Sequence, residues 1–234
     1  MPDASSRQPA DRFVVAIDGP SGSGKSSTAR GVAERMGYAY LDTGAMYRAA
    51  TWLVLNSDVD AAEQPLVAKL IAEADFGIGT DPKAPVFTVN GLDVTQAIRE
   101  PQISASVSKV ATNLDVRRML IARQQEIIAA AAPGIVAEGR DITTVVAPDA
   151  PVRVLLVADP AARVARRQTE LGGQVTISDV RDQVIRRDRD DSTVAQFEAA
   201  APGVTVIDST DLTLAQVIDR ICDLIDTAGR TMDV

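Results

Sequence analysis

The feature that constrains this chain most is a glycine-rich loop placed just after a short apolar run. Residues Gly19 to Ser26 fit the pattern G-x-x-x-x-G-K-[ST] without a mismatch, and the run FVVAI lies immediately upstream. Glycines let the backbone curl with its N–H groups pointing inward, and a following helix adds the positive end of its dipole. The sequence therefore predicts a strand, a phosphate-binding loop and a helix, which together hold a nucleoside triphosphate.

Two side chains of this loop have specific expected partners. Lys25 is placed to reach the β- and γ-phosphates, and the Ser26 hydroxyl suits a Mg²⁺ ion. The residues expected to bind the triphosphate are Gly19, Pro20, Ser21, Gly22, Ser23, Gly24, Lys25, Ser26 and Ser27. The loop alone does not separate GTP switches, nucleic-acid motors and kinases, so other features must decide.

Composition excludes several classes of protein. The 234 residues carry a net charge of −8 and include no histidine, which removes Ser-His-Asp catalysis and the usual histidine zinc sites. The acidic balance argues against wholesale binding to nucleic acid or an anionic membrane. The guanine-binding pattern N-K-x-D is absent, and the single cysteine, Cys222, is expected to be a buried apolar residue. We expect a cytoplasmic protein with no nucleic-acid or membrane partner.

Short apolar runs alternate with helical segments along the chain. Strands are expected at residues 13–18, 38–42, 134–141, 151–159 and 203–208. Helices are expected at residues 25–36, 45–55, 60–73, 104–132 with an interruption near 113–115, 160–171, 178–189 and 213–227. This alternation predicts an α/β fold with a parallel sheet covered by helices on both faces.

The segment Ala74–Thr95 has a different sequence pattern from the rest of the chain. Short alternating strands are separated by the turn pairs Asp81-Pro82 and Asn90-Gly91, which indicates a small antiparallel insert.

Toward the C-terminal part of the sequence, Asp159 follows an apolar strand and precedes a proline. We favour a helix N-cap at Asp159 over a metal-binding carboxylate. Metal binding by Asp18 or Asp141 stays open.

Arginines cluster where a second anion could bind. Arg140 follows a strand at its carboxyl end, where open α/β sheets bind ligands. The guanidinium group grips phosphate with two hydrogen bonds, so this position suits an acceptor phosphate. Further arginines between residues 163 and 189 flank Gly172-Gly173. They form either a mobile lid or a solvent-exposed, ion-paired face.

Five strings in this order carry a resemblance to a known family: IDGPSGSGKSS, YLDTGAMYR, SKVATNLDVRRML, AEGRDITTVVAPDAPV and RRDRDDST. Together they resemble the bacterial cytidylate kinases over about residues 13–225. The resemblance implies a P-loop fold, transfer of the γ-phosphoryl group of ATP to CMP or dCMP, a requirement for Mg²⁺, and a monomer. It also implies a single domain at 12–228 between a disordered tail at 1–11 and a tail at 229–234, with an acceptor-binding lobe at about 43–112 and a short helical lid at about 163–192.

The resemblance also implies roles for individual residues. Lys25, Arg48, Arg140 and Arg167 are expected to be catalytic, and Arg163 is expected to contact ATP from the lid. Expected substrate-binding residues are Thr43, Arg48 and Arg140 toward the acceptor, Ser108, Arg117 and Asp141 toward the cytosine and nucleoside, and Arg187 and Asp191 toward the pentose. The Ser26 hydroxyl is the expected metal ligand.

Two positions depart from the family pattern. Thr143 replaces a glycine in G-R-D-[IM]-G-T-V-V, and Val194 replaces an arginine that contacts nucleotide. These departures keep two alternatives open. One is a P-loop kinase of another small acceptor such as UMP, AMP or a sugar-like acid, and the other is a nucleotide-binding module with impaired turnover.

Overall fold

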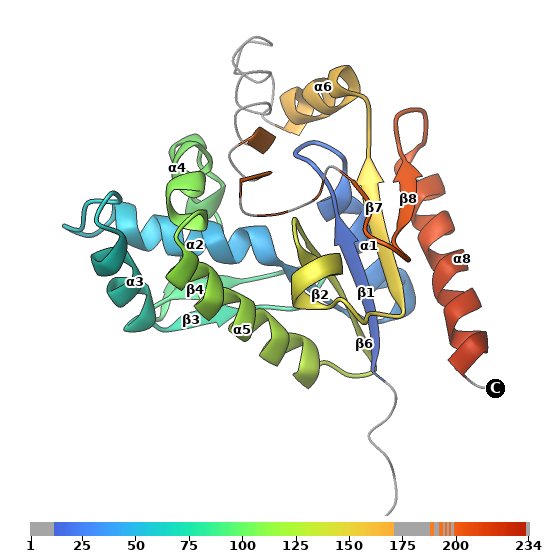
Figure 1. Cartoon of the computed structure of the whole chain (residues 1–234), viewed down its shortest axis with the longest axis horizontal. Coiled ribbons are helices and arrows are strands. Elements are labelled where there is room, and N and C mark those ends of the chain that lie inside the picture. Colours follow the sequence, from blue (N-terminus) through green and yellow to red (C-terminus); the bar gives the residue numbers. More distant parts are fainter. Residues whose placement is uncertain are drawn as a thin grey trace, which may run out of the picture.

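A computed structural model describes residues 12–170, 188–189, 192–193, 195, 197 and 199–232. Its centre is a five-stranded sheet in the order β2-β6-β1-β7-β8, in which every neighbouring pair is parallel (Figure 1). The strands are β1 (Phe13–Asp18), β2 (Ala39–Asp42), β6 (Gly134–Gly139), β7 (Val152–Val157) and β8 (Thr205–Asp208). The predicted α/β class and all five parallel strands are confirmed.

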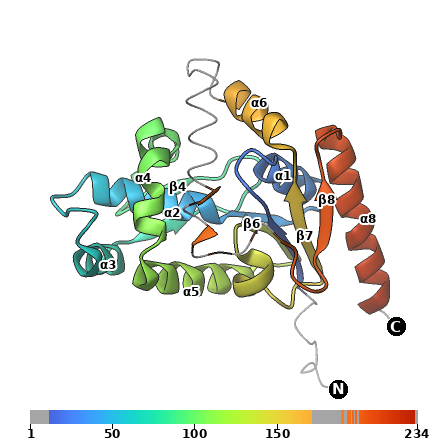
Figure 2. The same cartoon turned by 45° about the horizontal axis from the view of Figure 1, so that its top comes forward.

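Helices pack on both faces of this sheet, because the side chains of β1 alternate between two apolar clusters. Val15 and Ile17 contact the cluster beneath α1 (Lys25–Met36) and α8 (Leu214–Met232). Ala16 contacts the other cluster, which the remaining large helices cover. These helices are α2 (Thr43–Leu55), α3 (Gln64–Ala72), α4 (Pro101–Ala111) and α5 (Leu114–Ala130). Figure 2 shows α5 and α8 on opposite sides of the sheet. Burying each large aliphatic side chain in these clusters contributes about 1.5–3 kcal/mol.

The predicted antiparallel insert is confirmed as a separate three-stranded sheet. It contains β3 (Phe76–Ile78), β4 (Phe87–Val89) and β5 (Leu92–Asp93). Asn90 and Gly91 both have positive φ and form the two-residue turn between β4 and β5. The insert also covers one edge of the main sheet, because the backbone N–H of Tyr40 in edge strand β2 donates to Thr80 O at 2.8 Å.

Helix boundaries differ from the expected ones where local capping intervenes. The interruption predicted near 113–115 is confirmed, because the Asn113 side chain accepts hydrogen bonds from the N–H groups of Asp115 and Val116 and starts α5. The helix before it, α4, begins at Pro101 rather than at 104. The helix expected at 60–73 begins only at Gln64, and α8 continues beyond 227 to Met232. A 3₁₀ turn at Ala97–Arg99 and a π-helical turn at Ile142–Val146 were not expected.

The C-terminal part of the chain tests the predictions for Cys222 and for two helices. Cys222 is buried in the cluster beneath α8, as predicted. Helix α6 (Pro160–Glu170) matches the expected segment closely. The helix expected at 178–189 falls almost wholly outside the described residues. None of the described helices combines the length and the apolar character that crossing a membrane demands.

Candidate active site

The glycine loop closes the carboxyl end of β1, as the sequence predicts. Gly22 has φ 75°, and a Cβ there would lie 2.6 Å from the carbonyl oxygen of Arg163, so only glycine fits. Gly24 has φ 90° at the position that precedes α1. Gly22, Gly24, Lys25, Ser26 and Ser27 line a cavity of about 800 Å³. The loop therefore presents its backbone and the start of α1 to this cavity.

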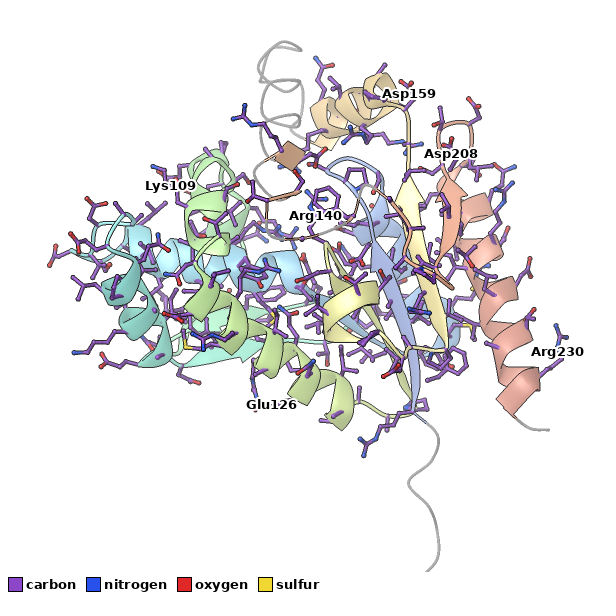
Figure 3. All side chains as sticks on the ribbon, in the orientation of Figure 1. Lys109, Glu126, Arg140, Asp159, Asp208 and Arg230 are labelled. Carbon is purple, nitrogen blue, oxygen red and sulfur yellow. The ribbon has the colours of Figure 1, made fainter. Side chains whose placement is uncertain are left out.

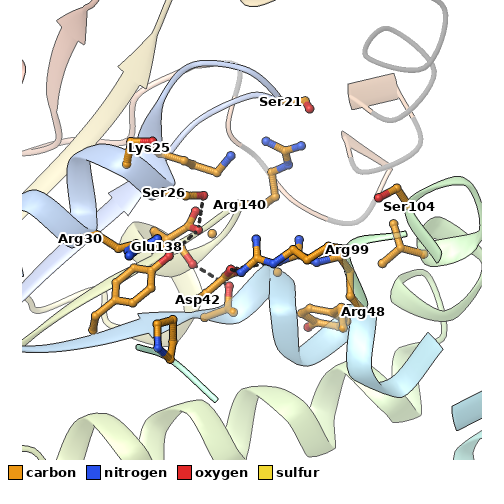
Figure 4. A pocket seen from close by; sticks show the side chains of 18 of the residues that line it. Ser21, Lys25, Ser26, Arg30, Asp42, Arg48, Arg99, Ser104, Glu138 and Arg140 are labelled. Atoms are coloured by element: carbon orange, nitrogen blue, oxygen red, sulfur yellow. Dashed lines mark hydrogen bonds and ion pairs between the residues drawn. The ribbon is translucent and has the colours of Figure 1, made fainter. Parts of the chain in front are cut away.

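Below the loop, Ser26 contacts a carboxylate that the sequence reasoning did not single out. The Ser26 hydroxyl donates to Glu138 Oε1 at 2.6 Å (Figure 4). The Lys25 ammonium donates to Pro20 O at 3.2 Å. Glu138 is 3% exposed at the carboxyl end of β6. Burial raises the pKa of Glu138, and the charge of nearby Asp42 raises it further. The acidic residue in the string AEGRD, at the end of a buried strand, was the signal that could have identified it.

Across the cavity, Asp42 holds two arginines. Arg48 Nη2 donates to Asp42 Oδ2 at 2.9 Å, and Arg99 Nη2 approaches the same oxygen at 3.3 Å (Figure 4). The other oxygen of Asp42 accepts from the Ala45 N–H at 2.7 Å and caps α2. Burial opposes ionisation of Asp42, yet the two guanidinium groups outweigh it and hold its pKa below the usual range. The Nε of Arg48 is buried and has no hydrogen-bond partner among the described residues.

A second ion pair also lines the cavity. Arg117 Nη2 donates to Asp141 Oδ2, and the Arg117 guanidinium lies 5.9 Å from the centre of the Tyr47 ring. Both charged side chains are largely buried. Helix α4 contributes Ser104, Val107 and Ala111 to the cavity wall. The predicted Ser108 is half-buried on α4 and does not line the cavity.

Arg140 lines the cavity above the carboxyl ends of the central strands (Figure 3). It donates to Gly19 O through Nη1 and to Asp188 Oδ1 through Nη2, the latter at 3.3 Å. Asp188 Oδ1 also accepts from the Ser21 N–H at 2.9 Å, and Asp188 Oδ2 accepts from Arg163. One buried carboxylate thus joins the loop, Arg140 and Arg163. Asp188 was not predicted, because only the fold brings it to residues more than 20 positions away.

Two arginines of α6 have different surroundings. Arg167 lines the cavity. Arg166 instead binds Ser209, through Nη1 to the hydroxyl at 2.9 Å and through Nη2 to the carbonyl at 2.6 Å. Arg166 also donates to Ser23 O, so it ties the loop to the end of β8. Three residues of the sequence analysis lie outside the described residues. They are the predicted Arg187 and Asp191, and Val194, which departs from the family pattern.

The acidic residues left open for metal binding have other partners. Asp18 accepts from the Ile142 N–H through Oδ1, and from the N–H and hydroxyl of Thr143 through Oδ2, at 2.6–2.8 Å. Thr143, one of the two departures, therefore adds a hydroxyl donor to a buried carboxylate. Asp159 accepts from the Ala161 N–H at the start of α6 (Figure 3), which confirms the predicted N-cap. Within the described ranges, no group of three or more His, Cys, Asp or Glu residues could hold a metal.

The cavity thus brings most of the predicted residues together around one space. Lining residues among them are Ser21, Gly22, Gly24, Lys25, Ser26, Ser27, Thr43, Arg48, Arg117, Arg140, Asp141 and Arg167. Gly19, Pro20 and Arg163 do not line it but contact residues that do. Ser23 does not line it either, and it contacts Arg166. Thr43 is fixed by donation of its hydroxyl to Glu138 O at 2.8 Å.

The family model of the cytidylate kinases matches residues 15–227. This chain belongs to the cytidylate kinase family. A cytidylate kinase of Cutibacterium acnes is 57% identical over 93% of this chain and 98% of its own length. One from Streptomyces griseus is 45% identical over 91% and 92%. The crystal structure of an uncharacterised protein from Eubacterium ventriosum shares the fold of this cytidylate kinase family member, with a TM-score of 0.52 at 12% identity over 92% of this chain and 99% of that one.

Proposed function

We propose that this chain transfers the γ-phosphoryl group of ATP to CMP or dCMP, giving CDP or dCDP and ADP. The observation that carries the proposal is a single cavity, lined by the glycine loop, by the Asp42–Arg48 pair and by the Arg117–Asp141 pair. Membership of the cytidylate kinase family supports the same reaction. The chain would act as a monomer in the cytoplasm, without a nucleic-acid or membrane partner.

On the donor side, the loop amides and Lys25 bind the phosphates of ATP. The Ser26 hydroxyl is suited to Mg²⁺, because it is fixed at the start of α1 by its bond to Glu138. When bound, Mg²⁺ would supply positive charge to the β- and γ-phosphate oxygens. Arg163 and Arg167 on α6 add guanidinium charge from the lid. Catalysis then depends on alignment and on stabilising negative charge.

On the acceptor side, Arg48 and Arg140 bind the phosphate of the monophosphate. The buried Nε of Arg48, without a partner among the described residues, gives this guanidinium a donor to offer. The acceptor phosphate is already ionised at neutral pH, so the attack needs no general base. A histidine-free sequence is compatible with such a reaction. Thr43, at the start of α2, lines the same cavity and contributes to this subsite.

Base selection falls to Asp141 and Arg117, with Ser108 as a family-derived third contact. A carboxylate accepts from the amino group of cytosine, whereas uracil presents a carbonyl there. Placing that carbonyl against the Asp141 carboxylate, where cytosine would donate, costs about 1–3 kcal/mol in a buried site. Arg187 and Asp191 are assigned to the pentose by family resemblance.

An acceptor panel tests this function. Purified protein, ATP and Mg²⁺ are incubated with CMP, dCMP, UMP, AMP or a sugar-like acid, and ADP formation is measured by a coupled assay. We expect CMP and dCMP to have kcat/KM at least about tenfold above the others. Asp141→Asn exchanges an acceptor for a donor and should lower the CMP-to-UMP ratio. Tight ATP binding without acceptor-dependent ADP formation would instead identify a module that lacks turnover.

A further inference from the structure

The guanidinium of Arg140 is contacted by an aromatic ring as well as by hydrogen-bond acceptors. Its Cζ lies over the ring of Phe197, 4.6 Å from the ring centre. Its N–H groups point to Gly19 O and to Asp188. The Arg140 side chain is only 13% exposed. A cation over an aromatic face is attracted more strongly when both groups are shielded from water, as they are here.

Phe197 is itself fixed in place. It is 1% exposed and packs with Leu155 of β7 and with Ala195 in a small apolar cluster. The ring therefore has a rigid support behind it and presents its other face to Arg140. It also lies in the stretch DSTVAQFEAA, where this sequence departs from the family pattern.

The two kinds of contact differ in what they leave available to a ligand. The carboxylate of Asp188 consumes N–H donors, and it is shared with Ser21 and Arg163. A ring contact uses the face of the guanidinium and leaves its N–H groups directed outward in their plane. The ring can therefore keep Arg140 in position while these N–H groups exchange one anion for another.

We propose that Phe197 is a positioning residue for Arg140: its ring holds the guanidinium beside the glycine loop in the orientation that binds the acceptor phosphate. The predicted effect on acceptor binding rests on the proposed function. The predicted coupling between Phe197 and Arg140 rests only on the contact between them. Without the ring, the guanidinium can rotate away from the orientation that it has over Phe197. Binding of the acceptor then weakens, while binding of ATP by the glycine loop is unchanged.

The experiment compares Phe197→Leu and Phe197→Tyr with the wild-type protein. Leucine keeps apolar volume but has no ring face, whereas tyrosine keeps the face. For Phe197→Leu we expect the KM for CMP to rise about three- to tenfold, with the KM for ATP within about twofold of the wild-type value. Phe197→Tyr should restore most of the acceptor affinity. Phe13→Leu is the matched control, because Phe13 also contacts a ring, that of Tyr38, at the opposite end of β1.

A purely apolar role for Phe197 predicts a different result. Phe197→Leu would then lower stability as Phe13→Leu does, with no selective change in the KM for CMP, and the inference would be overturned. A thermodynamic cycle on urea unfolding with Phe197→Leu, Arg140→Met and the double variant tests the contact without any turnover. Non-zero coupling supports the inference and additive effects contradict it, even if the wild-type protein phosphorylates no CMP.

Discussion

Glu138 is a carboxylic acid buried beneath the glycine loop, close to the buried carboxylate of Asp42. Its hydrogen bond from Ser26 compensates only part of the loss of hydration, and its pKa is raised. A carboxyl group whose pKa is higher in the folded state than in the unfolded chain makes the folded state less stable at high pH. Stability is thus lost as pH rises above the usual glutamate pKa of about 4.3.

We therefore expect Glu138→Gln to stabilise the protein near neutral pH. The gain should be largest at pH 7–8 and should shrink as pH falls to about 4, where the carboxyl of the unfolded chain is also protonated. Urea unfolding of both proteins across this range measures the effect. Glu34→Gln is the control, since Glu34 is exposed on α1 and its replacement should change stability by less than about 0.5 kcal/mol. A pH-independent difference for Glu138→Gln would contradict this account.

At the scale of elements, the N-terminus of α5 links helix capping to the site. The Asn113 side chain caps the helix, and its Nδ2 donates to Gln64 O at 2.9 Å. The backbone carbonyl of Asn113 accepts from the Arg117 N–H at 2.9 Å. Arg117 is thus held in the first turn of a helix whose start depends on one asparagine. The position of the ion pair with Asp141 follows from that cap.

Asn113→Ala should cost about 1–2 kcal/mol of stability, because a cap and a buried hydrogen bond are both lost. It should also raise the KM for CMP several-fold, since Arg117 moves with the first turn of α5. Thr213→Ala removes a comparable cap, at which Thr213 Oγ1 accepts from the Gln216 N–H of α8, remote from the cavity. Urea unfolding and steady-state kinetics on both variants separate the effects. Equal stability losses with equal KM values would contradict the link.

The elements were largely predictable from sequence, whereas several contacts in the site were not. Strand and helix positions follow from local periodicity and turn residues such as Asn90-Gly91. The break at Asn113 could be anticipated because a cap is a local feature. Glu138, Asp188 and Phe197 escaped prediction because each acts through a partner that only the folded chain brings close, such as Ser26, 112 positions before Glu138. Position along a helix also matters, since Ser104 of α4 lines the cavity and Ser108, one turn further along the same face, does not.

At the scale of the whole molecule, the insert and the main sheet share α2. Ala45 and Ala49 of this helix pack on Phe87 and Val89 of the insert, while Met46 and Ala50 pack in the cluster under the main sheet. The two apolar clusters are coupled through this helix, because losing either one exposes an apolar face of α2 to water. The insert should therefore unfold together with the rest of the expected domain at 12–228.

Trp52 provides a test, because it is the one tryptophan in the sequence and it packs against the insert cluster. We expect urea unfolding followed by tryptophan fluorescence and by far-ultraviolet circular dichroism to give coincident transitions. A tryptophan transition at lower urea would show that the insert unfolds independently, and the single-domain prediction would then be wrong.

The carboxylate of Asp188 gives the phosphate-binding arginines an internal counter-ion. Before any nucleotide arrives, one carboxylate already offsets part of the positive charge that Arg140 and Arg163 carry. A phosphate that takes these donors must displace the Asp188 carboxylate. The arginines therefore contribute to affinity only the difference between their interaction free energies with the phosphate and with the carboxylate. Binding that exchanges ions in this way stays reversible, which suits a protein that must release a product as highly charged as the molecules it received.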